Sequence, residues 1–358
     1  MDYTDKKLLE LLKFVAPGTE IRKGIDNILD AGTGGLIVLG AHEEVLKLCD
    51  GGFYINTPYN PQRIYELAKM DGAIVLTNDT QNIVYANVQL QPDPRIGTNE
   101  SGTRHRTAER VAKQTGESVI SISQKRKIIT IYKEEMKYSL RNISEIITEA
   151  NQAIKTLERF GDVVDKSLKN LTIMEFEDLV TLFEVTTILQ KFILMMEVAE
   201  EVEKYIVELG VEGRLIETQY EEIMIDIKKE IEALIKDYYL DIAKLDLNLI
   251  LKKFRNLADD ENSEIEEIAF ILGYKKRYET LDQKVVPRGY RLLGKIKRLN
   301  LKDIGNLSKS FDGLPAIIDA SEDELSEIDG ISKIKARSIK NEIRRLMITI
   351  EFEKKLKL

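Results

Sequence analysis

The feature that most constrains the fold is a long stretch of chain without proline. Of the 7 prolines in 358 residues, none lies between residues 95 and 286. Because proline interrupts helices, such a stretch permits helices of many turns. From about residue 137, apolar residues follow one helical face: Ile143, Ile146, Ile147, Ala150, Ile154 and Leu157. We therefore expect an all-α helical spine over 137–286.

Sparse glycines divide this spine. The expected breaks are at Gly161, Gly210, Gly213 and Gly273. No strict heptad survives those breaks, so we expect several helices instead of one continuous coiled coil.

The region before the spine mixes strand and helix signals. Short apolar runs rich in branched residues predict strands: LIVLGA (36–41), AIVLTN (73–78), NIVYANVQLQ (82–91) and SVISISQKRKIITIY (118–132). The last run is long enough for a hairpin that turns at residues 124–127. PQRIYELAKM (61–70) predicts a helix with proline in its first turn. Residues 1–136 should form an α/β domain.

The region after the spine, 287–358, reads as short helices separated by glycines. It contains 16 Lys and Arg against 11 Asp and Glu, a net charge of +5, whereas the whole chain carries −8 and the remainder therefore −13. Since phosphate backbones attract basic surfaces, any contact with nucleic acid should lie in this region.

The densest cluster of potential ligands is SGTRHRTAER (101–110). Two arginines flank one of only 2 histidines in the chain, at a glycine-containing loop that leads into a helix. Loop amides and first-turn N–H groups form an anion site, and arginine forks match phosphate oxygens. The cluster comprises Gly102, Thr103, Arg104, His105, Arg106 and Thr107. It fits a polyphosphate, but a solvated basic turn paired with Glu100 and Glu109 explains the same residue types.

A second candidate site is Asp71-Gly72-Ala73, at the predicted junction of a helix and a strand. A carboxylate there can hold Mg²⁺ or Mn²⁺, and the two small residues after it let a ligand approach the backbone. Asp-Gly is also a common turn sequence, so the motif by itself leaves both interpretations open.

The C-terminal region contains IDGISKIKA (328–336), which has the spacing of a tight hairpin between two helices. Its glycine permits the turn, and exposed N–H groups and lysines there can bind a DNA phosphate. The candidate DNA-binding residues are Gly330, Ile331, Ser332, Lys333 and Lys335. A hairpin that only packs within the protein is the alternative.

Together, DGA at 71–73 and SGTRHRTAER at 101–110 resemble the paired signature of the diadenylate cyclase family. With the spine and a helix-hairpin-helix segment after it, the whole chain resembles the DNA-integrity-scanning members of that family. The segment Arg288–Arg298 resembles a first hairpin less closely.

The resemblance implies an α/β cyclase domain with a central mixed sheet that converts two ATP molecules into cyclic di-AMP and two pyrophosphates. It also implies an octamer whose activity is repressed by branched DNA, bound without sequence preference. Asp71 would hold the Mg²⁺ or Mn²⁺ and help to activate the 3′-hydroxyl, while Gly72, Ala73 and Leu90 would lie against the nucleotide. Thr103, Arg104, His105, Arg106 and Thr107 would hold the phosphates.

Chemistry adds one requirement to this interpretation. One set of motifs holds one ATP, so two sites must face each other for the two nucleotides to react, which requires at least a dimer of cyclase domains. The spine would then let DNA at the C-terminal region change how the paired domains meet.

Two other classes of function remain open. A non-enzymatic DNA-binding scaffold could use nucleotide as a signal, although this gives no reason for an aspartate beside an Arg-His-Arg cluster. A metal-dependent nuclease would need more carboxylates than Asp71 supplies. No run approaches the roughly 18 apolar residues of a membrane span, and Cys49 is the only cysteine. We expect a cytoplasmic protein that does not bind a membrane.

Overall fold

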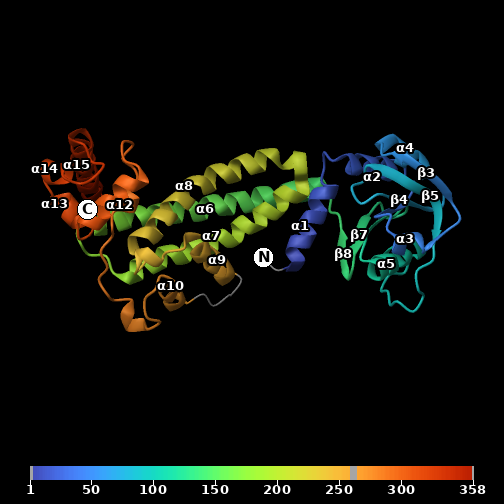
Figure 1. The fold of residues 1–358 in the computed structure, drawn as a ribbon, viewed down its shortest axis with the longest axis horizontal. Coiled ribbons are helices and arrows are strands. Elements are labelled where there is room, and N and C mark those ends of the chain that lie inside the picture. Colours follow the sequence, from blue (N-terminus) through green and yellow to red (C-terminus); the bar gives the residue numbers. More distant parts are fainter. Residues whose placement is uncertain (1–2, 259–263, 357–358) are drawn as a thin grey trace. The chain divides into compact units, whose positions relative to one another are not determined.

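The structure is a computed structural model that describes residues 3–258 and 264–356. The chain forms two compact units: residues 1–149 with 204–214, and residues 150–203 with 215–358. Each unit has its own apolar core, and Figure 1 shows the helices and strands of both.

A mixed sheet forms the centre of the first unit. Within the described residues it has eight strands in the order β2-β5-β4-β1-β6-β7-β8, with β3 paired to β5. The strands are β1 (Gly35–Leu39), β2 (Cys49–Asp50), β3 (Phe53–Pro58), β4 (Ala73–Leu76), β5 (Asn82–Leu90), β6 (Ser118–Ile122), β7 (Ile129–Lys133) and β8 (Met136–Ser139). β1 and β4 are parallel and the other neighbouring pairs are antiparallel. The mixed sheet that was expected is confirmed.

Helices cover both faces of this sheet. They are α1 (Tyr3–Val15), α2 (Glu20–Asp30), α3 (Glu43–Leu46), α4 (Pro61–Leu67) and α5 (Thr103–Thr115). Apolar residues of α1, α2 and α4 pack on one face, and those of α3 and α5 pack on the other. Every residue of β1, β4 and β6 is buried, because strands covered on both faces expose no side.

The predicted elements of this unit are found where the sequence placed them. The strand runs 73–78 and 82–91 contain β4 and β5, and the run 36–41 overlaps β1, which begins one residue earlier at Gly35. The helix α4 begins at Pro61, and the side chain of Asn60 caps it. β6 and β7 pair as an antiparallel hairpin whose connection includes residues 124–127.

Three long helices form the spine: α6 (Ile143–Phe176), α7 (Leu182–Leu209) and α8 (Arg214–Tyr238). The break expected at Gly161 is wrong, because this residue lies inside α6. A Cβ there would stand 3.2 Å from Ile227 of α8 and 3.7 Å from Met195 of α7. The glycine therefore lets the helices approach each other, as their parallel course in Figure 1 also shows. The breaks at Gly210 and Gly273, which both have positive φ, are confirmed.

Shorter elements lie between α7 and α8 and after α8. They are the 3₁₀ helices η1 (Gly210–Gly213), η2 (Ile242–Lys244) and η3 (Tyr278–Thr280), and the helices α9 (Leu247–Ala258), α10 (Ile265–Ile271), α11 (Tyr290–Leu293), α12 (Leu301–Ser310), α13 (Gly313–Asp319), α14 (Glu322–Ser326) and α15 (Lys333–Leu356). Side chains from α11 to α15 share one apolar cluster. Among the residues that the structure describes, no helix is both long and apolar enough to cross a bilayer.

Candidate nucleotide site and nucleic-acid groove

The topology of the sheet gathers the candidate nucleotide-binding residues at one edge. Asp71 and Gly72 precede β4, and Gly34 precedes β1, which runs parallel to β4. Leu90 ends β5 and Ile122 ends β6, and these two strands run antiparallel to β4 and β1. The starts of β1 and β4 and the ends of β5 and β6 therefore share an edge.

The first turn of α5 reaches the same edge. The Arg104 Nη1 atom lies 3.5 Å from the carbonyl oxygen of Ile122, and a Cβ on Gly34 would collide with that guanidinium. Gly34 thus provides the space in which Arg104 crosses the start of β1. The sequence analysis missed this contribution of Gly34, since contact between residues so far apart leaves no local signal.

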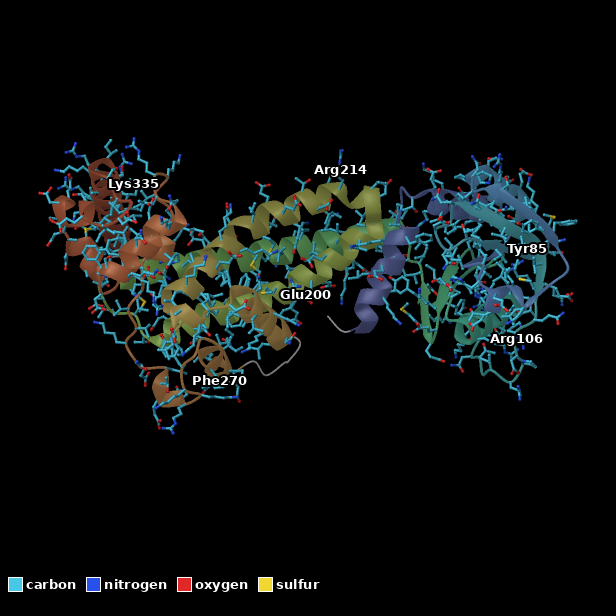
Figure 2. The ribbon with its side chains drawn as sticks, in the orientation of Figure 1. Tyr85, Arg106, Glu200, Arg214, Phe270 and Lys335 are labelled. Atoms are coloured by element: carbon cyan, nitrogen blue, oxygen red, sulfur yellow. The ribbon has the colours of Figure 1, made fainter. Side chains whose placement is uncertain are left out.

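The N-terminus of α5 is open to an anion. Gly102 occupies the cap position in extended conformation and contributes no side-chain cap, while its carbonyl accepts the first helical hydrogen bond, from Arg106. The N–H groups of the first turn therefore lack an intrahelical acceptor, and they lie beside the exposed Thr103 and the half-buried Thr107. Figure 2 shows Arg106 on this helix.

The alternative of a basic turn neutralised by nearby acids is not what the structure shows. Glu100 pairs with Lys137 and accepts a hydrogen bond from Tyr132, and Glu109 pairs with Lys113 and accepts one from Thr98. Burial alone would favour both neutral acids, yet these contacts lower the pKa of each carboxyl. Within residues 3–258 and 264–356, neither glutamate forms an ion pair with Arg104 or Arg106. The two guanidinium groups thus keep their charge for another partner.

The second motif has a packing role in addition to any chemical one. A Cβ on Gly72 would lie 2.2 Å from the backbone carbon of Asn87, so β5 approaches too closely for any other residue. Ala73 is 2% exposed and Leu90 is 8% exposed, and both belong to the core beneath α5. Asp71 is exposed at the end of this packed segment. The small residues thus fix the backbone that presents the Asp71 carboxylate.

The oxygen ligands available at this edge suit a hard divalent cation that is bound mainly through the phosphates of a nucleotide. Among the described residues, no group of three or more His, Cys, Asp or Glu side chains is placed to hold a metal ion. Mg²⁺ is commonly bound by one or two carboxylates together with substrate phosphates and water. A single exposed Asp71 at the same sheet edge as the uncapped N-terminus of α5 fits that pattern.

The candidate DNA hairpin connects α14 and α15. Gly330 has a φ of +85°, as the turn requires, and Ile331 is buried in the apolar cluster. The Ser332 hydroxyl accepts a hydrogen bond from the backbone N–H of Lys335. Lys333 is 86% exposed, and its nearest acid is Asp323 at 3.8 Å.

We expected Lys335 to add charge to this hairpin, but its ammonium is already paired within the protein. Its Nζ lies 2.6 Å from Asp303 and 2.9 Å from the carbonyl oxygen of Gly330. Figure 2 shows it among the helices of this region. The lysine therefore ties the turn to α12, and its charge is neutralised by Asp303.

A basic groove of about 720 Å³ lies next to the hairpin. It is lined by cationic residues from two segments: Lys295, Lys297, Arg298, Lys333, Arg337 and Arg345. The last four positions of the segment 288–298 thus line the basic groove, although this segment matches a hairpin less closely. Arg337 and Arg345 of α15 were not predicted from the sequence, because helical arginines usually indicate only a solvated face.

The remaining basic residues of that segment have structural roles. Arg288 donates hydrogen bonds to backbone carbonyls at the end of α8, those of Lys236, Asp237 and Leu240. Arg291 is 2% exposed and pairs with Glu175 of α6. Both side chains therefore form contacts within the protein.

Two family models match separate regions of the chain. Residues 22–137 match the family model described as DisA bacterial checkpoint controller nucleotide-binding, named DAC, and residues 140–281 match the DisA bacterial checkpoint controller linker region. A solved structure of a double mutant of DacA from Staphylococcus aureus aligns with 41% of this chain and with 95% of its own chain. The sequence identity is 17% and the TM-score is 0.30.

Full-length relatives are more similar. The DNA integrity scanning protein DisA of Clostridium perfringens (strain SM101) is 48% identical over 352 residues, 98% of this chain and 99% of its own. The protein of the same name from Acetivibrio thermocellus is 49% identical over 342 residues, 96% and 95% of the two chains. The chain therefore belongs to the family of DNA integrity scanning proteins DisA, and its N-terminal unit contains their diadenylate cyclase domain.

Proposed function

We propose that the protein condenses two ATP molecules into cyclic di-AMP, with release of two pyrophosphates, and that DNA bound at the basic groove controls this activity. The observation that carries the proposal is the shared sheet edge, which brings Asp71 and the open N-terminus of α5 together. A carboxylate and an Arg-His-Arg cluster at one edge match the needs of nucleotidyl transfer: a group near the attacking hydroxyl and cations near the departing phosphates.

The reaction takes place twice. In each step the 3′-oxygen of one ATP bonds to the α-phosphorus of the other, and the bond from that phosphorus to pyrophosphate breaks. Arg104 and Arg106 stabilise the negative charge that accumulates on the pyrophosphate. The Asp71 carboxylate orients the 3′-hydroxyl and accepts its proton as the new bond to phosphorus forms. Gly102, Thr103, His105 and Thr107 hold the phosphates at the helix end, and Gly72, Ala73 and Leu90 form the floor beneath the nucleoside.

A divalent cation completes this site. Asp71 would hold Mg²⁺ or Mn²⁺ together with the phosphates, and the cation would supply positive charge to the transferring group.

Assembly follows from the stoichiometry. Each cyclase domain offers one set of residues and the product joins two nucleotides, so two domains must face each other. We propose a homo-oligomer built from such pairs, an octamer as the resemblance to the family implies. Residues 1–136 would be the catalytic part, 137–286 the spine and 287–358 the DNA-binding part, and a DNA-scanning enzyme of this kind would act in the cytoplasm.

The control by DNA rests on the basic groove. Gly330, Ile331 and Ser332 form the turn, Lys333 supplies exposed charge, and Lys335 keeps the turn in place through Asp303. Contacts of this kind are made to the phosphate backbone, so we expect branched or damaged DNA to bind without sequence preference.

The test is turnover of ATP by the full-length protein with Mg²⁺ or Mn²⁺, with products separated by chromatography and identified by mass. The wild-type protein should form cyclic di-AMP, and the Asp71→Asn variant should form none while still binding DNA. Unchanged ATP with both metals, in a folded protein that binds DNA, would instead support the non-enzymatic scaffold. DNA cutting that Asp71→Asn abolishes would support a nuclease, an outcome that the lone carboxylate disfavours.

A further inference from the structure

A series of hydrogen-bonded side chains holds His105 and extends away from the nucleotide edge. It lies in the first turn of α5, and its Nδ1 atom is 3.0 Å from the hydroxyl oxygen of Tyr132 on β7. The two rings meet edge to face, with centroids 6.3 Å apart. The Tyr132 hydroxyl in turn lies 2.9 Å from the Glu100 carboxylate.

An ion pair and burial fix the other members of this hydrogen-bonded series. Lys137 is the cross-strand neighbour of Tyr132 and forms an ion pair with the same Glu100 oxygen. Tyr132 is 1% exposed and belongs to the core between the sheet and α5. The hydroxyl therefore has little freedom to turn toward another partner.

The direction of each hydrogen bond follows from counting protons. An ionised carboxylate only accepts, so the single hydroxyl proton of Tyr132 is donated to Glu100. The Tyr132 oxygen must then accept from His105, which requires a hydrogen on Nδ1. Burial together with Glu100 raises the pKa of Tyr132, so this residue remains a phenol, and the contacts of Lys137 and Tyr132 lower the pKa of Glu100 against the effect of its burial.

We propose that Glu100, Tyr132 and Lys137 are positioning residues that hold His105 in the Nδ1–H tautomer, so that Nε2 is the ring nitrogen presented to the nucleotide. The opposite side of the ring supports this orientation, because the Cδ2 atom next to Nε2 lies 3.7 Å from the position of a Cβ on Gly102, at the open end of α5. The part of the proposal that concerns turnover rests on the proposed function, whereas the tautomer does not.

The consequence is a defined role for Nε2. In neutral His105 it accepts a hydrogen bond, and in the cation it donates one to a phosphate oxygen. Burial lowers the pKa of His105, with Glu100 opposing and Lys137, Arg104 and Arg126 adding to this effect. Without nucleotide these effects favour the neutral ring, whereas an anionic phosphate beside Nε2 favours the cation, in which Nε2 donates to a phosphate oxygen.

The test uses ¹⁵N solid-state NMR of the full-length protein labelled at histidine, because chemical shifts distinguish protonated from unprotonated ring nitrogens. The chain has 2 histidines, so His42→Gln leaves His105 as the one histidine observed. His42 is an exposed residue that contacts Glu117 on the opposite side of β1 from the nucleotide edge. We expect Nδ1 protonated and Nε2 unprotonated at neutral pH. An Nε2–H tautomer, or an equal mixture, would overturn the proposal regardless of turnover.

Two variants separate positioning from a general structural role. Tyr132→Phe keeps the buried ring and removes the hydroxyl, so the tautomers should mix and kcat should fall roughly 10- to 100-fold, with little change in KM for ATP. Glu100→Gln lets the amide donate to Tyr132, so that the hydroxyl can point at Nδ1 and the Nε2–H tautomer becomes populated. A wild-type tautomer and unchanged kcat in both variants would contradict the proposal.

A matched control lies on the neighbouring strand. Tyr138 on β8 also donates its hydroxyl to a carboxylate, that of Glu208 at 2.8 Å. Tyr138→Phe should leave the His105 tautomer and kcat unchanged. If it lowered kcat as much as Tyr132→Phe does, the loss would reflect general packing. If wild-type protein made no cyclic di-AMP but showed the expected tautomer, the proposed function would fail and the positioning of His105 would stand.

Discussion

Two arginine-containing segments, 104–106 and 288–291, look alike in the sequence and serve opposite purposes. Each lies close to a glycine at the start of a helix. At α5 the nearby carboxylates are bound to other groups, so Arg104 and Arg106 remain available to a ligand. At α11 the guanidinium of Arg291 is buried against Glu175.

The difference lies in where the acids are. Glu175 and Asp237 come from the ends of α6 and α8, and both are about 1% exposed. Asp237 accepts hydrogen bonds from the backbone N–H groups of Tyr290 and Arg291, so it caps α11. Where a buried carboxylate accepts from the backbone N–H groups at the start of a helix, that helix end has a structural role. Where these N–H groups lack an acceptor, the helix end is a candidate binding site.

The largest effect expected from this comparison concerns catalysis. Arg104→Ala combined with Arg106→Ala should lower the formation of cyclic di-AMP by about 10³-fold or more, because in the proposed mechanism both guanidinium groups stabilise the departing pyrophosphate. The unfolding midpoint should stay within a few degrees of wild type, since neither arginine pairs with Glu100 or Glu109. The measurement is turnover together with thermal unfolding.

Arg63→Ala is a suitable control for that experiment. Arg63 contacts Thr57 and the carbonyl of Pro58, on α4 away from the nucleotide edge. It should retain turnover. Unfolding of the double variant, with Arg63→Ala unaffected, would show that the cluster at α5 is structural after all.

The second prediction concerns the opposite segment. Arg291→Ala should lower the free energy of unfolding of the second unit by about 3–5 kcal/mol, because it leaves buried Glu175 without its cation. Urea unfolding followed by circular dichroism measures this loss. Arg345→Ala, which removes an exposed arginine 3.2 Å from Glu342, should change it by no more than about 0.5 kcal/mol. Equal effects of the two substitutions would contradict the structural role of this helix end.

Much of the cyclase fold could be predicted from the sequence, because its strands are local patterns. Branched apolar runs bounded by turn residues identified β1, β4 and β5, and the apolar spacing from Ile146 to Leu157 identified the buried face of α6. The strand β3 was missed, since it lies at an edge and exposes most of its residues.

The parts that could not be predicted are contacts between distant residues. Gly161 has the sequence signature of a helix break, and only the approach of Ile227 explains it inside a helix. Tyr132 reads as an ordinary strand residue, and only the fold places its hydroxyl between Glu100 and His105. The motifs of the site were recognisable, whereas the groups that orient them were not.

As a third test, the stability of the two units should depend on pH in opposite ways. Burial, together with the charge of Glu175, raises the pKa of Asp237 to about 7, above its usual value of 3.8. The folded chain therefore binds this proton more tightly than the unfolded chain. The resulting stabilisation is complete below about pH 4 and is lost as the pH rises through about 7.

The stability of the second unit should thus fall, by an amount on the order of a few kcal/mol, between pH 5 and pH 8. Glu100 and Glu109 in the first unit have lowered pKa values, so their contribution has the opposite sign and is lost as the pH falls. Urea unfolding at both pH values measures the slopes. Asp237→Asn should flatten the slope of the second unit, and an unchanged slope in this variant would assign the effect to other groups.

The smallest effect expected concerns two neighbouring lysines on one hairpin. Lys333 is exposed at the basic groove, while the Lys335 ammonium is bound to Asp303. Lys333→Ala should weaken binding of a four-way DNA junction only several-fold, and should reduce the slope of log affinity against log salt by about 1, as expected for one phosphate contact. Lys335→Ala should leave that slope unchanged and instead lower thermal stability, because it frees the buried Asp303 carboxylate. Fluorescence anisotropy over a range of salt concentrations separates the two, and Lys244→Ala, at an exposed position in η2, should change neither quantity. If Lys335→Ala reduced the salt slope as much as Lys333→Ala, its ammonium would leave Asp303 when DNA binds, and the distinction between a structural and a ligand-binding cation would fail at this hairpin.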